Sequence, residues 1–466
     1  MTNSGIHSPS MRMLTIRCGA AALILLATSA SQAQAPPEKV ALTGGRIIPV
    51  VGKQIREGVV LIERGKIVAV GDDVKVPYDA RVYDVKGKVV FPGLIDAHSS
   101  RGMDVANEAR PVTPHLDVYD AIDPSQLYYE DALRLGTTAI HIVPGNNTVI
   151  GGVSRVVRPI GLSVAEMTIA EGSFLKISAR PKRGFDRMLQ LATIREAFLE
   201  LDDYLEKLAE QRYEEDLKKK EKKIDVGPAE ARKRGRALIR AEDIDDQHRN
   251  LLRLRGGQVP DTDKHGRSIL KPLGAMIYCE RAMDVGHAVH MARENGFLDR
   301  SVFVLGSECY KAIGELKKAA RPVVLGPTLI HRETDPLTGE ITEIFVPKRI
   351  ADAGLLFALT PGPNDSLAER MLTYQAARCV RSGIPRAVAI RAITINAAKI
   401  LGLEDRLGSI EPGKDANLVV YSGDPLDFNS VVERVFIDGI PAYDRTSDVR
   451  LKRLLGTESQ GDQDDE

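Results

Sequence analysis

The feature that most constrains the fold is the alternation of short apolar runs with helical patterns through the middle of the chain. The candidate strands read VVFPGLIDA, TTAIHIV, GAMIYC, SVFVLG, RPVVLG and GLLFALT. Each is almost wholly apolar, as expected for strands buried on both faces of a parallel sheet. Helical patterns follow several of them, including DVGHAVHMAREN and YKAIGELKKAA. This alternation predicts an α/β fold of the (β/α)8 TIM type, with the active face at the carboxyl ends of the strands.

Both ends of the sequence have a different texture. KVALTGGRIIPV near the beginning and VVERVFIDGIPAYD near the end show the period-two alternation of half-buried strands, bounded by glycines. We therefore expect a small composite β-sandwich domain built from both terminal segments. The expected organisation is 38–91 and 406–446 for the two parts of the sandwich, 92–405 for the barrel, and 447–466 for a polar, acidic tail.

One stretch interrupts the strand and helix alternation. From Phe185 to Lys223 the apolar residues recur at helical spacing and then give way almost entirely to charges. This pattern is typical of an amphipathic helix that runs out into solvent. We expect residues 186–256 to form a charged helical insertion on the barrel rim, with a solvated face favoured over a partner-binding one.

The first residues read as an export signal. Arg12 and Arg17 precede the apolar run GAAALILLA, and the small residues TSASQAQA follow. The apolar run is too short to cross a bilayer comfortably. We expect residues 1–35 to be a signal peptide, and the protein to be exported to the periplasm or the extracellular space. The mature chain should begin between Ser29 and Pro36 and contain no membrane span.

Charge and cysteine content limit the partners and the covalent framework. Lysine plus arginine equals aspartate plus glutamate at 64 each, so a small-molecule ligand is expected rather than nucleic acid or an anionic membrane. The oligomeric state is left open. Downstream of the signal, Cys279, Cys309 and Cys379 are odd in number, which favours three buried thiols. A Cys279–Cys309 bond is the alternative.

Five motifs together resemble one known family. They are GKVVFPGLIDAH, VIGGVSRVV, KPLGAMIYCERAMD, VVLGPTL and AITINAAKILGLEDRLGSIEPGKDANLVV. The chain is similar to the amidohydrolase superfamily of metal-dependent hydrolases, near its imidazolonepropionase-related branch. The resemblance implies the barrel with a composite β-sandwich and the hydrolysis of non-peptide C–N bonds. Such hydrolysis needs a water activated by one or two divalent metals, and a carboxylate that moves its proton.

The resemblance also implies a set of metal ligands, most of which this chain replaces. His98 is the first histidine of a His-x-His pair whose second member is Ser100. Tyr278 and Leu305 stand where the family has histidines, and Pro361 stands near its strand-end aspartate. Leucine and proline side chains have no ligand atom. The resemblance therefore implies a degenerate metal site, with no metal or a weakly bound divalent ion, zinc if any. Alternatively, His98 is an uncharged, hydrogen-bonded residue without a metal.

Other polar residues near the expected strand ends are candidates for catalysis or binding. Glu280, Asp365 and Tyr278 are the catalytic candidates, and the Tyr278 hydroxyl is suited to donate to an oxyanion. The loop PGNNTVIGG can turn backbone amides toward a ligand, although a tight loop without a ligand explains the same residues. The candidates for substrate binding are Asn146, Asn147, Gly151 and Gly152.

Two functional classes follow from these observations. One is an active metal-dependent amidohydrolase acting on a small amide, a cyclic amide or a dipeptide. The other is a catalytically impaired barrel that binds a ligand or partner. The replaced ligands favour the second class, because a fold by itself does not carry a reaction. His141 is expected to pack within a strand, and His287 and His290 are expected at the surface of a helix.

Overall fold

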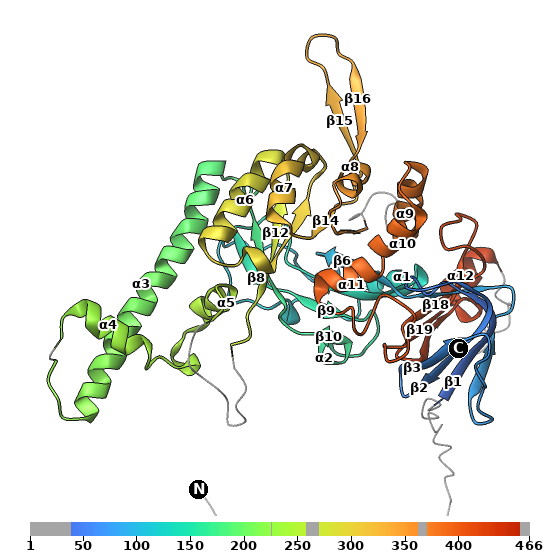
Figure 1. The fold of residues 1–466 in the computed structure, drawn as a ribbon, viewed down its shortest axis with the longest axis horizontal. Coiled ribbons are helices and arrows are strands. Elements are labelled where there is room, and N and C mark those ends of the chain that lie inside the picture. The colour runs from blue at the N-terminus through green and yellow to red at the C-terminus, as the bar shows by residue number, and fades with distance from the viewer. Residues whose placement is uncertain (1–38, 225, 258–269, 362–370, 457–466) are drawn as a thin grey trace, which may run out of the picture. The chain divides into compact units, whose positions relative to one another are not determined.

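Strands from both ends of the chain pair in one eight-stranded sheet, which we call the terminal sheet (Figure 1). Its central junction joins residues more than 300 positions apart, because Val419 lies opposite Phe91 in an antiparallel pair. Its order is β20-β19-β18-β5-β1-β2-β3, with β4 paired to β1. The strands are β1 (Lys39–Ile47), β2 (Ile55–Glu63), β3 (Lys66–Gly71), β4 (Arg81–Asp84), β5 (Val89–Pro92), β18 (Leu418–Tyr421), β19 (Val432–Ile437) and β20 (Ile440–Asp444).

The computed structural model describes residues 39–224, 226–257, 270–361 and 371–456, all within the compact unit Pro37–Glu466. The expected signal peptide, Asp365 and the last ten residues of the expected acidic tail, 457–466, lie outside the described residues. Within the described ranges the chain is a mixed α/β protein, and no helix is both long enough and apolar enough to cross a bilayer.

Two further sheets contain the parallel strands expected from the apolar runs. The smaller has the order β10-β9-β7-β6, and the larger has the order β17-β14-β13-β12-β11-β8. Neighbours among β11, β12, β13, β14 and β17 are parallel, as are β6 and β7. The strands are β6 (Leu94–Ser99), β7 (Thr137–Ile142), β8 (Ile150–Val153), β9 (Arg155–Val157), β10 (Thr168–Ala170), β11 (Phe174–Ser178), β12 (Gly274–Cys279), β13 (Ser301–Leu305), β14 (Val323–Leu325) and β17 (Phe357–Leu359).

These two sheets meet at both ends. Residues 150–157 belong to both, because β8 pairs with β11 while β9, one residue further on, pairs with β7. At the opposite end, Thr360 Oγ1 lies 2.8 Å from Asp96 Oδ1 and 2.6 Å from the carbonyl oxygen of His98. The carboxyl ends of β17 and β6 are therefore held together by a buried hydroxyl.

The passage from the terminal sheet to the parallel strands depends on a glycine. Gly93 separates β5 from β6, and its N–H donates to the carbonyl of Asn417 at 2.8 Å. A Cβ atom at position 93 would lie only 1.9 Å from Thr138 Oγ1. The single apolar run VVFPGLIDA thus becomes two strands in two sheets, because only glycine fits at the crossing.

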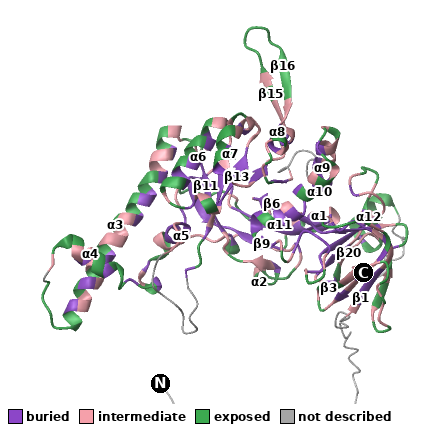
Figure 2. Cartoon of the chain, in the orientation of Figure 1, coloured by how far each residue is buried: buried purple, intermediate pink, exposed green. Residues whose placement is uncertain are grey.

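The central parallel strands are buried along most of their length, and the helices contribute residues of one face to the same core (Figure 2). Their bounds are α1 (Leu127–Arg134), α2 (Val164–Met167), α3 (Arg187–Lys219), α4 (Pro228–Arg236), α5 (Asp246–Leu254), α6 (Ala282–Glu294), α7 (Ile313–Ala319), α8 (Val346–Asp352), α9 (Leu372–Arg381), α10 (Arg386–Ala392), α11 (Ile395–Leu401) and α12 (Val449–Leu455). Short 3-10 turns are η1 (Val118–Asp120), η2 (Ala241–Asp243), η3 (Leu298–Arg300), η4 (Ser307–Ala312) and η6 (Arg445–Ser447).

The helix expected from Phe185 to Lys223 is α3. Asp186 caps it by accepting a hydrogen bond from the Leu189 amide at 2.8 Å. Its first turns bury Ile194 and Phe198, whereas Met188, one of the apolar residues that recur at helical spacing in this stretch, is 77% exposed. The outer half packs on α4, where Gly235 allows the backbones to approach: a Cβ there would lie 1.8 Å from the Ala209 carbonyl oxygen.

A two-stranded hairpin, β15 (Ile330–Thr334) and β16 (Ile341–Phe345), projects beside α8 (Figure 1). The three described cysteines are free and buried, which confirms the expectation of buried thiols. Cys279 ends β12, but Cys309 lies in the turn η4 and not at the end of a strand, and its thiol donates to the carbonyl of Cys279 at 3.2 Å.

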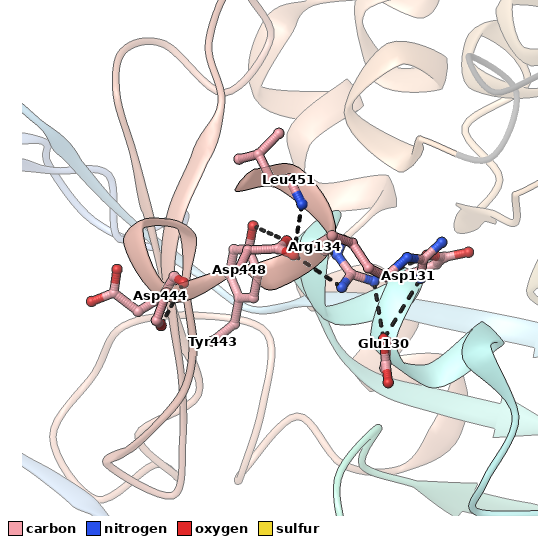
Figure 3. A network of polar contacts seen from close by, with 9 residues as sticks. Glu130, Asp131, Arg134, Tyr443, Asp444, Asp448 and Leu451 are labelled. Atoms are coloured by element: carbon pink, nitrogen blue, oxygen red, sulfur yellow. Dashed lines mark hydrogen bonds and ion pairs between the residues drawn. The ribbon is translucent and has the colours of Figure 1, made fainter. Parts of the chain in front are cut away.

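The last described helix is tied to the first by a polar network (Figure 3). Arg134, at the end of α1, donates from Nε to Asp448 Oδ2 at 2.8 Å and also pairs with Glu130 and Asp131. Asp448 caps α12 by accepting from the Leu451 amide, and it also accepts from the Tyr443 hydroxyl at 3.1 Å. A carboxylate bonded by three donors joins segments far apart in the sequence.

Candidate functional site

A cavity of about 660 Å³ opens where several parallel strands end, and we call it the strand-end cavity. Residues at or just beyond the carboxyl ends of β6, β12, β13, β14 and β17 line it. Its volume lies within the range of small-molecule sites, about 300–1,000 Å³. The side chains that matter most for its chemistry are His98, Arg101, Asn146, Tyr278, Glu280 and Arg281.

A lysine that the sequence analysis did not identify lies beneath this cavity. Lys176, on β11, is fully buried, and its Nζ hydrogen bonds to His98 Nε2 at 2.9 Å and to Asn146 Oδ1 at 2.6 Å. Its Nζ is also 5.6 Å from the centre of the Tyr278 ring. Burial lowers the pKa of Lys176 to about 7. The available signal was a single charge inside the apolar run FLKIS.

His98 lies on β6 and is buried, with only 7% of its surface exposed. Burial, together with the charge of Lys176, holds the pKa of His98 well below its usual value. Its backbone N–H donates to Asp96 Oδ1 at 3.1 Å. The imidazole therefore stays uncharged near neutral pH, and its Nε2 atom is occupied by Lys176.

A second imidazole is buried on the neighbouring strand, and both of its nitrogens have partners within the protein. His141 Nδ1 lies 3.0 Å from the carbonyl oxygen of Ala97, and its Nε2 lies 2.7 Å from Ser154 Oγ. Burial lowers the pKa of His141 to about 4. With both nitrogens bonded, this histidine joins β6, β7 and the shared segment 150–157, as expected for a packed residue.

Asp96, two residues before His98, is a buried carboxyl held by Thr360 and the His98 amide. Burial raises its pKa to about 6. Its second oxygen, Oδ2, has no hydrogen-bond partner among the described residues. Asp96 lines a separate small cavity of about 40 Å³ with Arg101 and Tyr128, so this carboxyl orients the end of β6 instead of facing the larger cavity.

The four positions at which this chain replaces metal ligands implied by the family resemblance all line the strand-end cavity. They are occupied by Ser100, Tyr278, Leu305 and Pro361. Among the described residues, no group of three or more His, Cys, Asp or Glu side chains is placed to hold a metal ion. Zinc in proteins normally has at least three protein ligands, mostly imidazole, thiolate or carboxylate. The described donor set, with the His98 Nε2 atom bonded to Lys176, does not fit such a site.

Two of the catalytic candidates line the cavity, and the third is not described. Burial raises the pKa of Tyr278 to about 12, so its hydroxyl stays protonated as a donor. Glu280 is ion-paired with Arg180, whose Nε lies 3.1 Å from its carboxylate. Asp365 falls in the segment 362–370, outside the described residues. Glu280 therefore has its charge compensated by the protein.

The candidates for substrate binding separate into different environments. Asn146 lines the strand-end cavity and bonds to Lys176. Asn147 holds the loop together, because its side-chain oxygen accepts from the Arg183 amide at 2.7 Å. Gly151 and Gly152 were expected in a loop, but they lie within β8 because this segment pairs with β11. They line a second cavity of about 300 Å³.

The remaining polar candidates lie away from the strand-end cavity. His287 and His290 are exposed on α6, and His290 pairs with Glu294 at 3.1 Å. A different histidine, His331 at the base of the hairpin, lines the strand-end cavity, with Nδ1 3.2 Å from Ser307 Oγ.

Comparisons with known proteins agree with the resemblance. The model of the amidohydrolase family matches residues 368–443. An amidohydrolase of solved structure from Thermotoga maritima MSB8 superposes with a TM-score of 0.70 and 30% identity, covering 87% of this chain and 100% of that one.

Two relatives match in sequence at lower identity. The imidazolonepropionase of Geobacillus kaustophilus is 24% identical over 82% of this chain and 89% of its own length. Amidohydrolase tasK of Hapsidospora irregularis is 24% identical over 83% of this chain, which spans only 40% of that protein. The solved structure, similar along its whole length, carries the assignment, and this chain belongs to the amidohydrolase superfamily.

Proposed function

We propose that this amidohydrolase has a degenerate metal site, is catalytically impaired, and uses the strand-end cavity to bind a small polar molecule. The observation that carries the proposal is the contact between Lys176 Nζ and His98 Nε2 at 2.9 Å. A metal ion at His98 would have to displace this hydrogen bond. With a pKa of about 7, Lys176 is partly protonated at neutral pH, and its ammonium form has no lone pair to offer and repels a cation.

The chemistry of the surrounding wall supports the same proposal. Ser100 is a weak ligand, and Leu305 and Pro361 have no side-chain ligand atom. Activation of water for amide hydrolysis needs a Lewis acid or a strong base held beside the scissile bond. Glu280 is the described carboxylate nearest to that role among the candidates, and its carboxylate is engaged in an ion pair with Arg180.

The competing function is an active metal-dependent amidohydrolase acting on a small amide, a cyclic amide or a dipeptide. The retained His98 and the activities of the family favour it. The two functions differ in metal content, so the decisive measurement is elemental analysis of purified protein grown with added zinc. We expect far less than one metal ion per chain, and no loss of bound metal on His98→Ala.

One result would overturn the proposal outright. The neutral amine of Lys176 can add CO2 and become a carbamate, whose oxygens are metal ligands. Native mass spectrometry showing this adduct together with one or two metal ions, both lost in Lys176→Met, would establish a metal centre. Hydrolysis of an amide that disappears in the same variant would restore the active-enzyme function.

We also propose that the two parallel sheets close into the (β/α)8 barrel. The shared segment 150–157 and the Thr360 bonds to the end of β6 support closure at the two junctions. The pairing of β18 with β5 supports a composite sandwich made of 38–91 and 406–446, with 186–256 as an insertion. Limited proteolysis should cut the insertion first and leave the terminal sheet intact. Early separation of the two termini would contradict this organisation.

Export is the remaining part of the proposed function. Its support is the Arg-flanked apolar segment followed by small residues. We expect intact-mass measurement of protein from the periplasmic or extracellular fraction to give a mature start between Ser29 and Pro36. A chain in the cytoplasmic fraction that still begins at Met1, Met11 or Met13 would contradict it.

A further inference from the structure

The floor of the strand-end cavity contains a buried amine that has no counter-ion among the described residues when it is protonated. Lys176 contacts only the imidazole of His98 and the amide of Asn146 through hydrogen bonds, and among the described residues no carboxylate lies within ion-pair distance of its Nζ. An ammonium has three N–H donors. Two of them have these partners, so the third lacks an acceptor in the described part of the chain. Burying a cation in this way is costly unless an anion accompanies it.

Two further cations at the same cavity form no ion pair with the described residues, although the charge of Arg101 acts on the buried Asp96 carboxyl and partly offsets the rise in its pKa. Arg101 lies with its guanidinium carbon 4.7 Å from the centre of the Tyr128 ring, and Arg281 lies on the cavity wall next to Glu280 in sequence. Neither has an ion pair with any described residue. Guanidinium groups held by stacking are suited to bind carboxylates in a bidentate fashion.

The carboxylates of the same lining are fewer than its cations. Glu280 pairs with Arg180 at 3.1 Å, whereas Glu308 has no ion pair among the described residues and accepts a hydrogen bond from the Ala282 amide at 3.4 Å. Arg101, Arg281 and protonated Lys176 therefore outnumber the one carboxylate, Glu308, that is left without an ion pair. A negatively charged ligand would supply the charge that the described fold leaves out.

Part of the cavity lining is apolar. Val304, Leu305, Pro327 and Pro361 form this part, together with the ring of Tyr278. Inorganic anions have no apolar part that could use this surface, whereas an organic acid has both a charged end and an apolar body. The cavity volume of about 660 Å³ admits a body larger than a single amino-acid side chain.

We propose that the strand-end cavity binds a small organic carboxylate. Its charged end contacts the floor formed by Lys176, His98 and Asn146, with Arg101 beside it, and its body lies against the wall at Leu305 and Pro361. This inference rests on the proposed function, because it assigns to a lysine the cationic role that metal ions have in related enzymes. It differs from that proposal in naming the class of ligand.

The experiment is calorimetric titration of the full mature chain with acetate, benzoate and hippurate, each compared with its neutral amide. We expect at least one carboxylate to bind about tenfold more tightly than its amide, or better. In Lys176→Met this preference should disappear. Asn146→Asp should also weaken carboxylate binding at least about tenfold, because an internal carboxylate would then neutralise Lys176. Lys318→Met, which removes an exposed lysine of α7, is the control with the same charge change and should bind as the unmodified protein does.

Two binding results would overturn the inference. Carboxylates that bind no more tightly than their amides, or equally well to Asn146→Asp, would overturn the inference even if Lys176→Met failed to fold. Binding of inorganic phosphate without any organic acid would also overturn it. Stoichiometric metal in the same preparation would refute the proposed function instead. Metal-free protein that binds none of the three carboxylates would refute only the proposed class of ligand.

Discussion

Arg134 and Lys176 are both basic side chains at least partly buried in the fold, but they differ in their partners and in the direction of their pKa shifts. Arg134 pairs with Asp448, Glu130 and Asp131 (Figure 3), and its hydrogen bond with Asp448 raises its pKa further. Lys176 is more deeply buried but contacts an imidazole and an amide, and burial lowers its pKa to about 7. The charge of Arg134 is balanced by carboxylates of the fold. Lys176 has no carboxylate partner among the described residues and lies beside a cavity, and a strongly shifted pKa in such a place is typical of a functional position.

The largest expected effect concerns the pH dependence of stability at Lys176. Its folded-state pKa, about 7, is below the value of 10.5 for a free lysine, so between these values the unfolded chain binds more protons. Stability attributable to this residue is therefore lowest below pH 7 and rises with pH through that window. Between pH 7 and pH 9.5 the free energy of unfolding of the unmodified protein should rise by about 3 kcal/mol relative to Lys176→Met. Urea unfolding of both proteins at the two pH values measures it.

If the difference in free energy of unfolding between the unmodified protein and Lys176→Met does not change with pH, Lys176 has its ordinary pKa. The contrast with Arg134 would then fail. Lys318→Met provides the control, because its amine is exposed and should leave the pH profile unchanged.

The next effect is at the paired cation. Arg134→Ala should reduce the free energy of unfolding by about 2 kcal/mol at pH 7, because it leaves the Asp448 carboxylate, whose side chain is only 3% exposed, without its main partner. The pKa of Asp448 is lowered to about 2, first by the hydrogen bond from Arg134. The stabilisation is thus present above pH 4 and lost as pH falls through about 2. Hydrogen exchange of α12 at pH 7 and at low pH measures the loss of stability and its pH dependence. Equal protection of α12 in the unmodified protein and in Arg134→Ala at pH 7 would contradict the expected loss.

A smaller effect is expected from the amide that contacts Lys176. Asn146→Ala removes one acceptor from a buried donor and should cost about 1 kcal/mol at pH 7. The cost should be smaller near pH 9.5, where the amine is neutral. Asn147→Ala is the matched control, since that side chain bonds to a backbone amide and should give a loss independent of pH in this range. Denaturant unfolding at both pH values distinguishes the two residues.

The smallest effect is expected at Arg450. Its side chain is 50% exposed and pairs with Asp131 and Glu130 at the surface. Arg450→Ala should change the free energy of unfolding by at most about 0.5 kcal/mol, because solvent and salt screen such pairs. A loss as large as that of Arg134→Ala would show that the network acts as one unit.

The sequence predicted the strands and the residues at their ends better than it predicted their contacts. Apolar runs fix strands because burial on both faces demands them, so β12, β13 and β17 lie where the pattern placed them. Lys176 was missed because its strand, FLKIS, contains a charge, which weakens the apolar signal. Its contact with His98 spans 78 positions, and the pair of Arg134 with Asp448 spans 314. No local pattern predicts contacts at such separation.

The segment that belongs to two sheets has a consequence for engineering this protein. Val153 and Arg155 pair in different sheets, with the single residue Ser154 between them. Because side chains alternate along a strand, one extra residue here would turn the following side chains of β9 to the opposite face. The outer part of α3 with α4, by contrast, packs mainly on itself. Fusions and truncations are therefore best made in that arm, whereas residues 150–157 should be kept at their natural length.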